Sequence, residues 1–193
     1  MFELVFAVLL AVFVLYVKSI WFSVLAIFIL GALLLPGVYS MLYGAPFIPT
    51  SKKRIKAILD LGNFSERDIV YDLGCGDGRI IRAIAKMKVK KAVGYEFSIP
   101  TYLYARLKTA LYGRGEKIIF GNFWNKDLAD ADVLICFFLD RTMRDFERKI
   151  WPNLRTGTRV ISNEFKMKDV EPKNKQDSVY LYVKKIDSKV SLK

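Results

Sequence analysis

The sequence of 193 residues contains no histidine and only two cysteines, Cys75 and Cys136, which lie far apart. Without histidine the chain lacks the commonest general base and metal ligand, and it cannot build a Ser-His-Asp or Cys-His nucleophilic site. A zinc site needs about four closely spaced ligands, which two isolated cysteines do not supply. We therefore predict two reduced thiols, no metal, and a reaction that needs no imidazole base.

Charged residues are nearly missing from the first 43 residues, which contain only Glu3 and Lys18. A bilayer core of about 30 Å is spanned by roughly 20 apolar residues. We expect a membrane segment at 1–43 with two transmembrane helices, at about 2–17 and 20–42; the alternative is a single span at 20–43. A cleaved signal peptide is disfavoured because the N-terminus is not basic.

Residues 44–193 carry the whole net charge of +12 and are long enough for one domain. They begin with a basic cluster, Lys52-Lys53-Arg54 and Lys56. Short basic flanks of membrane segments stay in the cytoplasm and attract anionic lipid. The sequence thus predicts an integral protein of the cell membrane, in contact with the lipid bilayer, whose domain faces the cytoplasm.

Strands and helices alternate along 44–193, which is typical of an α/β fold with a doubly wound, mostly parallel sheet. We predict helices at 51–61, 77–88, 100–112 and 141–154, and strands at 68–73, 91–97, 117–120, 131–139 and 158–165. Residues 178–186 alternate between apolar and polar and predict a last, antiparallel strand. The polar stretch 167–177 is expected to be a loop, which leaves the end of the sheet shortened.

The segment Asp72-Leu-Gly-Cys-Gly-Asp-Gly-Arg79 follows a predicted strand and opens a helix. Glycines let the backbone approach a ligand, and a helix start offers N–H groups. The motif of a dinucleotide-binding site is G-x-G-x-x-G, but this sequence has Arg79 at the position of the third glycine. The carboxylates of Asp72 and Asp77 would repel a pyrophosphate. They suit S-adenosylmethionine (SAM), which carries a sulfonium, an ammonium and a ribose.

Two later segments complete the predicted cofactor site. Glu96 ends the next strand, where a carboxylate can accept both ribose hydroxyls. After the third strand, Asn122-Phe123-Trp124 offers a polar group and a ring to adenine. The cofactor-binding residues that we predict are Asp72, Gly74, Cys75, Gly76, Asp77, Gly78, Glu96, Phe97, Asn122 and Phe123.

The segment at 72–79 resembles motif I of class I SAM-dependent methyltransferases. Residues 44–50 (GAPFIPT) resemble the segment that precedes the methyltransferase domain in one branch, the small archaeal protein-lysine methyltransferases and the mitochondrial lysine methyltransferases of ATP synthase c-subunit and adenine nucleotide translocase. The similarity extends over nearly all of 44–186. It implies a class I methyltransferase domain at 44–193 with Asp72, Gly74, Gly76 and Glu96 at the cofactor.

The resemblance also implies the substrate, a protein with an accessible lysine. The membrane segment suggests that this protein lies in a membrane, and we expect the enzyme to be a monomer. A lysine amine has a pKa near 10.4 and must be neutral to accept a methyl group, which burial in an aromatic pocket favours. Our candidates for positioning the amine are Tyr43, Thr50, Asn163 and Glu164.

Other acceptors remain open. The basic surface is compatible with RNA, but residues 138–141 lack the Asn/Asp-Pro-Pro-Tyr motif of enzymes that methylate amino groups of nucleic acids, so nucleic acid is not favoured. A tethered enzyme could also methylate a lipid or a quinone. A binding role without catalysis is not favoured, because Asp72, Gly74 and Glu96 are all present.

Overall fold

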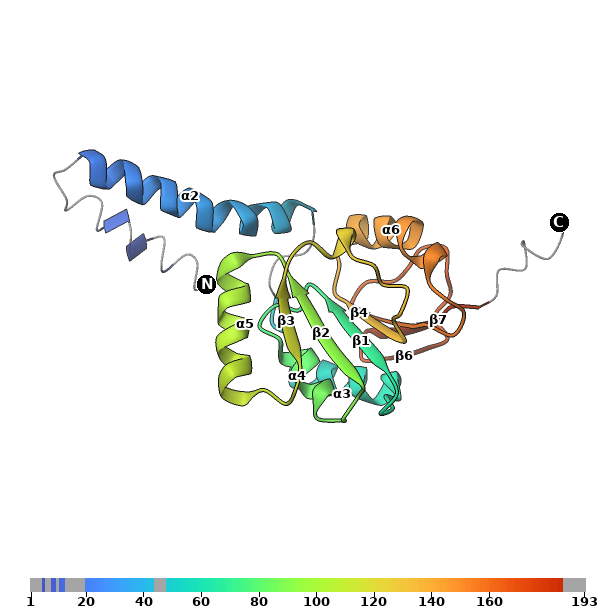
Figure 1. Ribbon diagram of the computed structural model, residues 1–193. Coiled ribbons are helices and arrows are strands. Elements are labelled where there is room, and N and C mark those ends of the chain that lie inside the picture. Colours follow the sequence, from blue (N-terminus) through green and yellow to red (C-terminus); the bar gives the residue numbers. More distant parts are fainter. Residues whose placement is uncertain (1–4, 6–7, 10, 13–19, 44–47, 186–193) are drawn as a thin grey trace.

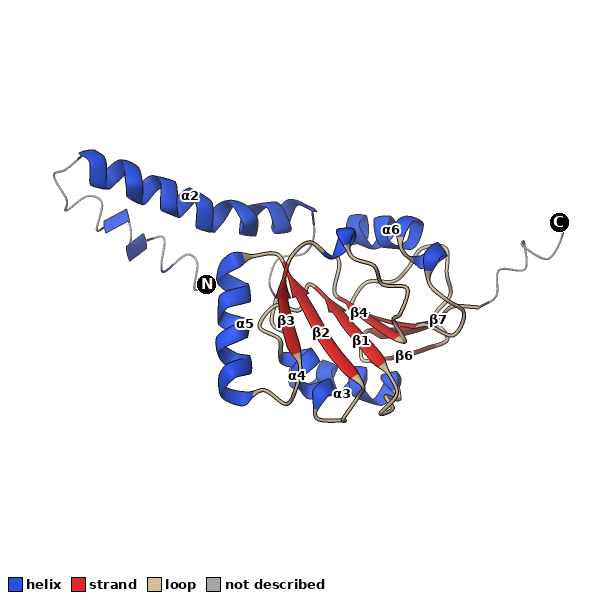
Figure 2. Cartoon of the chain, in the orientation of Figure 1, coloured by secondary structure: helices blue, strands red, loops and turns tan. Residues whose placement is uncertain are grey.

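The computed structural model describes residues 5, 8–9, 11–12, 20–43 and 48–185, and for 36–43 only the backbone. Its centre is a seven-stranded sheet in the order β3-β2-β1-β4-β5-β7-β6 (Figures 1 and 2). The strands are β1 (Ile69–Leu73), β2 (Lys91–Glu96), β3 (Lys117–Phe120), β4 (Val133–Cys136), β5 (Arg159–Asn163), β6 (Asn174–Gln176) and β7 (Val179–Val183). The first five strands pair in parallel, and β7 runs antiparallel to both of its neighbours, β5 and β6, so the predicted α/β fold with a mostly parallel sheet is confirmed.

Helices of the domain cover both faces of this sheet, whereas the N-terminal helix projects beyond it (Figures 1 and 2). The helices are α2 (Ile20–Tyr43), α3 (Lys52–Gly62), α4 (Arg79–Ala85), α5 (Ile99–Tyr112) and α6 (Asp140–Lys149), with short 3-10 turns at Phe123–Asn125 and Trp151–Asn153. α3, α4 and α5 pack one apolar core around Ile58 and Ile81, and α6 packs a second core around Phe146. Burial of these two apolar layers is the main stabilising term of the domain.

The N-terminal segment differs from the prediction. The region expected to form the second membrane span is helical, and this helix, α2, contacts α5 of the domain. Within the described residues, however, no helix has both the length and the apolar character that crossing a bilayer requires. The predicted location as an integral membrane protein is therefore wrong. Most of the other expected span, 2–17, lies outside the described residues.

The end of the sheet also differs from the prediction. Part of the polar stretch 167–177 forms β6, which pairs antiparallel with β7 and completes the seven strands. β6 lies at the edge of the sheet, so only one of its sides bonds to a neighbouring strand and its polar side chains stay largely exposed. An edge strand of this kind does not need alternating apolar residues, so the sequence pattern did not reveal it. The sheet is not shortened at this end.

A largely buried ion pair connects the segment before β1 with the start of β5. Arg159 Nη2 lies 2.7 Å from Asp68 Oδ2, and Nη1 of the same guanidinium donates to the carbonyl of Asn63 at 2.7 Å. Asp68 precedes β1 and Arg159 begins β5, while Asn63 caps α3 in a left-handed conformation. A guanidinium can satisfy all of these acceptors at once because its five donors are arranged in a fixed fork.

Candidate active site

A cavity of about 380 Å³ opens where the parallel strands β1, β2 and β4 end. Ligands of open α/β sheets bind in this place, beyond the carboxyl ends of the strands. Every cofactor residue predicted from the sequence except Gly78 lines the cavity. Gly78 instead caps α4 with φ of 76°, and a Cβ at this position would meet the side chain of Ile118 at 3.1 Å.

The glycine turn is held by the end of β2. The N–H groups of Gly74 and Cys75 both donate to the carbonyl of Tyr95 at 2.9 Å, and the N–H of Gly76 donates to Glu96 Oε2 at 2.9 Å. These three N–H groups therefore hold the turn in place and are not available to a ligand. Gly74 has φ of 86°, and a Cβ added there would meet nothing within 4 Å, so the turn presents bare backbone at the cavity.

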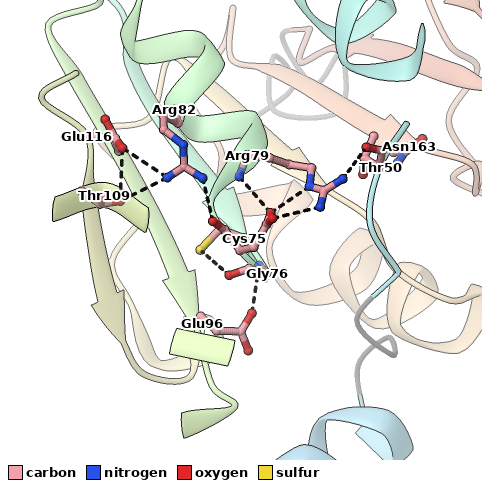
Figure 3. Close-up of polar contacts among 10 residues, drawn as sticks. Thr50, Cys75, Gly76, Arg79, Arg82, Glu96, Thr109, Glu116 and Asn163 are labelled. Atoms are coloured by element: carbon pink, nitrogen blue, oxygen red, sulfur yellow. Dashed lines mark hydrogen bonds and ion pairs between the residues drawn. The ribbon is translucent and has the colours of Figure 1, made fainter. Parts of the chain in front are cut away.

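Glu96 lines the cavity and also accepts backbone hydrogen bonds that hold the glycine turn in place. Its Oε2 accepts from the N–H of Gly76, as Figure 3 shows. Its Oε1 accepts from the N–H groups of Phe97 at 2.9 Å and Ser98 at 2.8 Å. The side chain is buried, and because a carboxylate has about two acceptor sites on each oxygen, these bonds already fill those of Oε1. The sequence predicted contact with ribose and did not foresee the structural role.

Asp72 has a buried carboxylate oxygen that is available to a ligand. It is 3% exposed, and its Oδ2 has no hydrogen-bond partner among the described residues. Burial, together with the nearby carboxylates of Glu96 and Asp77, raises its pKa to about 8. A buried carboxylate without a partner is costly to ionise, and a cation placed beside it would remove that cost. This orphaned oxygen in an acidic cavity fits a positively charged cofactor such as SAM.

Asp77 lines the same cavity, but its charge is already matched. Arg79 Nε and Nη2 bind the two carboxylate oxygens of Asp77, each at 2.9 Å, and lower the pKa of this carboxyl despite its burial. Arg79 Nη1 also donates to the carbonyl of Thr50 at 3.1 Å. This role of Arg79 was not predicted from the sequence, although an acid and a base two residues apart in one turn were a possible signal.

Aromatic rings line the cavity together with the glycine turn. Phe97 stacks on Phe120 at 6.1 Å between ring centroids, and Phe123 stacks on Phe138 at 5.1 Å. The lining also includes Trp124, which belongs to the predicted adenine segment 122–124, and Phe137, which was not predicted from the sequence. Planar rings suit a flat base such as adenine and shield the interior from water.

The four candidates for positioning a substrate amine do not stay together. Asn163 Nδ2 donates to Thr50 Oγ1 at 3.2 Å, and both residues are buried, Thr50 at the cavity wall and Asn163 behind it. Glu164 lies outside the cavity lining and pairs with Arg54. The side chain of Tyr43 lies outside the described residues. Both cysteines are buried and free, as predicted.

Residues 72–174 match the family model described as the ANTKMT methyltransferase domain. The chain belongs to this family. A protein-lysine N-methyltransferase of Saccharolobus islandicus is 40% identical over 150 residues, a match that covers 72% of this chain and 92% of that protein. The lysine N-methyltransferase of the ATP synthase c-subunit from Mus musculus is 30% identical over 122 residues, which cover 62% of this chain and about half, 49%, of the mouse protein.

Among solved structures, an RNA methyltransferase of Salinibacter ruber in complex with S-adenosyl-L-homocysteine has a TM-score of 0.67 and 28% identity. The match covers 72% of this chain and 95% of that protein. The bound product of SAM in that structure agrees with the acidic, ring-walled cavity of this one. This member of the ANTKMT family is a SAM-dependent methyltransferase, with SAM as its cofactor.

Proposed function

We propose that the enzyme transfers the methyl group of SAM to the side-chain amine of lysine in proteins, with residues 44–193 as its methyltransferase domain. The observation that carries this proposal is the 40% identical archaeal relative named for that activity, which this chain covers almost completely. Asp72 and Glu96 hold the cofactor, and the backbone of Gly74 and Gly76 allows its close approach. Phe97, Asn122 and Phe123 face its adenine.

SAM supplies an electrophilic methyl carbon: as the amine nitrogen bonds to that carbon, the carbon–sulfur bond breaks and its electron pair stays on sulfur. The protein has to place a neutral amine in line, since proximity and orientation account for much of the rate of such transfers. The aromatic wall favours the neutral amine, because burial disfavours the charged form. The proton leaves to solvent, so no imidazole is needed.

Thr50 and Asn163 are the residues that we assign to the amine. Thr50 Oγ1 receives one hydrogen bond from Asn163 and has a second lone pair at the cavity wall. Asn163 Oδ1 is buried and finds no partner in the described part of the chain. Asn163, which lies behind the cavity wall, orients the hydroxyl of Thr50. The remaining lone pair of Thr50 Oγ1 can accept an N–H of a neutral amine whose own lone pair is directed at the methyl carbon.

Incubation with methyl-labelled SAM and an extract of native cells tests the function. We expect the label in protein, to survive nuclease and lipid extraction, and to appear as methyl-lysine after hydrolysis. The Salinibacter neighbour and the net charge of +12 make RNA the second candidate. Label that nuclease removes would favour RNA, and label in the organic phase would indicate a lipid or quinone acceptor. A Glu96→Ala variant, which should bind SAM poorly, is the negative control.

Replacing Thr50 by valine should lower kcat/KM for a protein substrate about 10- to 100-fold. The amine nitrogen becomes positively charged as it gains the methyl group, and a hydrogen bond to a charged group is worth about 1.5–3 kcal/mol. The matched variant Thr50→Ser keeps the hydroxyl and should recover most of the activity. Cofactor affinity, measured by calorimetry, should change little in both variants. Equal activity of the valine and serine variants would remove Thr50 from the site.

A further inference from the structure

A second hollow, of about 540 Å³, lies between α3, α4 and α5. Six basic residues line it: Lys52, Arg79, Arg82, Lys86, Lys108 and Arg114. We call this hollow the basic cleft. It adjoins the cofactor cavity, because Thr50, Asp77 and Arg79 belong to the walls of both. A molecule bound in the basic cleft therefore lies beside the proposed position of the substrate amine.

Two of the six cations are matched by acids. Arg79 pairs with Asp77, and Arg82 lies 3.5 Å from Glu116 while it also donates to Thr109 Oγ1. Both of these acids are buried, and their negative charges compensate the charges of Arg79 and Arg82. Arg82 in addition donates to the carbonyl of Asp77 at 2.9 Å, which fixes this part of the wall.

The other four cations differ in having no acidic partner among the described residues. Across that part of the chain, Lys52, Lys86, Lys108 and Arg114 make no ion pair, and Lys108 Nζ lies 5.1 Å above the ring of Tyr104. Four unmatched positive charges around one hollow make a positive potential that attracts anions. Ile55, Leu111 and Tyr112 lie among them and offer apolar contact.

We propose that the basic cleft binds the carboxylates of an acidic segment next to the target lysine of the protein substrate. This inference rests on the proposed function. An enzyme with a net charge of +12 repels a lysine-rich segment, so the substrate lysine needs negative neighbours to approach. The mixture of cations with apolar side chains suits a peptide, whereas single-stranded nucleic acid favours a groove that follows its backbone.

The test uses the full-length enzyme and three labelled probes. One is a 15-residue peptide whose single lysine is flanked by glutamates, the second has glutamines in place of those glutamates, and the third is a single-stranded RNA oligonucleotide. Fluorescence anisotropy measures binding, and label transfer from SAM measures KM and kcat. The variant Lys86→Glu/Arg114→Glu reverses two unmatched charges, and Lys173→Glu/Lys175→Glu is the control, because these exposed residues line neither cavity.

We expect the glutamate peptide to bind about tenfold more tightly than the glutamine peptide at low salt, and the cleft variant to lose this preference. The loss should appear in KM rather than kcat, and affinity for SAM should not change. The control variant should keep the preference. Added salt should weaken binding of the glutamate peptide, because exposed charges are screened beyond about 10 Å at 0.1 M.

The possible failures separate the two proposals. Equal KM values for both peptides in the wild type, with methyl-lysine formed, would overturn the basic cleft and leave the proposed function in place. Selective binding of the glutamate peptide, with no methyl-lysine formed from either the peptide or the cell extract, would support the cleft as a binding site for acidic peptides and overturn lysine methylation. RNA binding that only the cleft variant loses, with the peptides unaffected, would assign the cleft to nucleic acid and overturn the inference.

Discussion

Replacing Glu96 by alanine is expected to weaken SAM binding about 100-fold or more and to lower the free energy of unfolding by about 3–5 kcal/mol. Loss of the ribose contact accounts for roughly 1.5–3 kcal/mol of binding. The variant also leaves the buried N–H groups of Gly76, Phe97 and Ser98 without their acceptor, so the glycine turn loses its anchor. Calorimetry gives the affinity, and denaturant unfolding gives the stability.

Glu116 provides the matched control for this variant. It is a buried glutamate as well, and it accepts from the N–H of Arg114 and from Thr109 Oγ1, away from the cofactor cavity. Glu116→Ala should therefore lower stability without a specific loss of SAM affinity, measured where both variants are folded. If the two variants lose affinity equally, the effect is general loosening of the fold and Glu96 is not a cofactor ligand.

The fold could be predicted where the side chains themselves carry the signal. The buried strand β4 is a continuous apolar run, and the turn from β1 to α4 is marked by three glycines that all adopt positive φ. The order of strands and helices then restricts the topology, since parallel crossovers are right-handed. The antiparallel pairing of β7 with β5 agreed with its alternating pattern and was confirmed.

The wrong predictions concern segments whose structure depends on packing against the rest of the chain and not on their own composition. The edge strand β6 is Asn-Lys-Gln, which no apolar pattern reveals, and it forms because β7 offers a free edge. The apolar N-terminal run indicated membrane spans from composition alone, whereas the described part of α2 lies against α5.

Within the site, the sequence grouped Asp77 with Asp72 and Glu96 as cofactor acids. The structure separates them: Arg79 neutralises Asp77, whereas Asp72 Oδ2 has no hydrogen-bond partner among the described residues.

Replacing Asp72 by asparagine is expected to raise the stability of the protein without cofactor and to weaken SAM binding. In the native state the pKa of Asp72 is about 8, against 3.8 in the unfolded chain. Between these values the native state binds the extra proton, so stability of the wild type falls as pH rises from about 4 to 8. At pH 9 the asparagine variant should be more stable by about 2–5 kcal/mol, and near pH 4 the two should be equal.

Asp77 should show the opposite behaviour, since Arg79 lowers the pKa of this carboxyl. The variant Asp77→Asn should therefore be less stable than the wild type at neutral pH. The difference should disappear as the pH falls through the native pKa of the carboxyl, because the wild type then loses the same charge. Denaturant unfolding of both variants across this range compares the two acids directly.

Cofactor binding supplies an independent measurement on Asp72. A cationic ligand selects the ionised carboxylate, so SAM affinity should rise with pH up to about 8, and binding at pH 7 should release close to one proton. Calorimetry in two buffers of different ionisation enthalpy counts that proton. If binding releases none and the asparagine variant binds SAM as tightly as the wild type, the buried carboxylate faces no cation and the cofactor must lie elsewhere in the cavity.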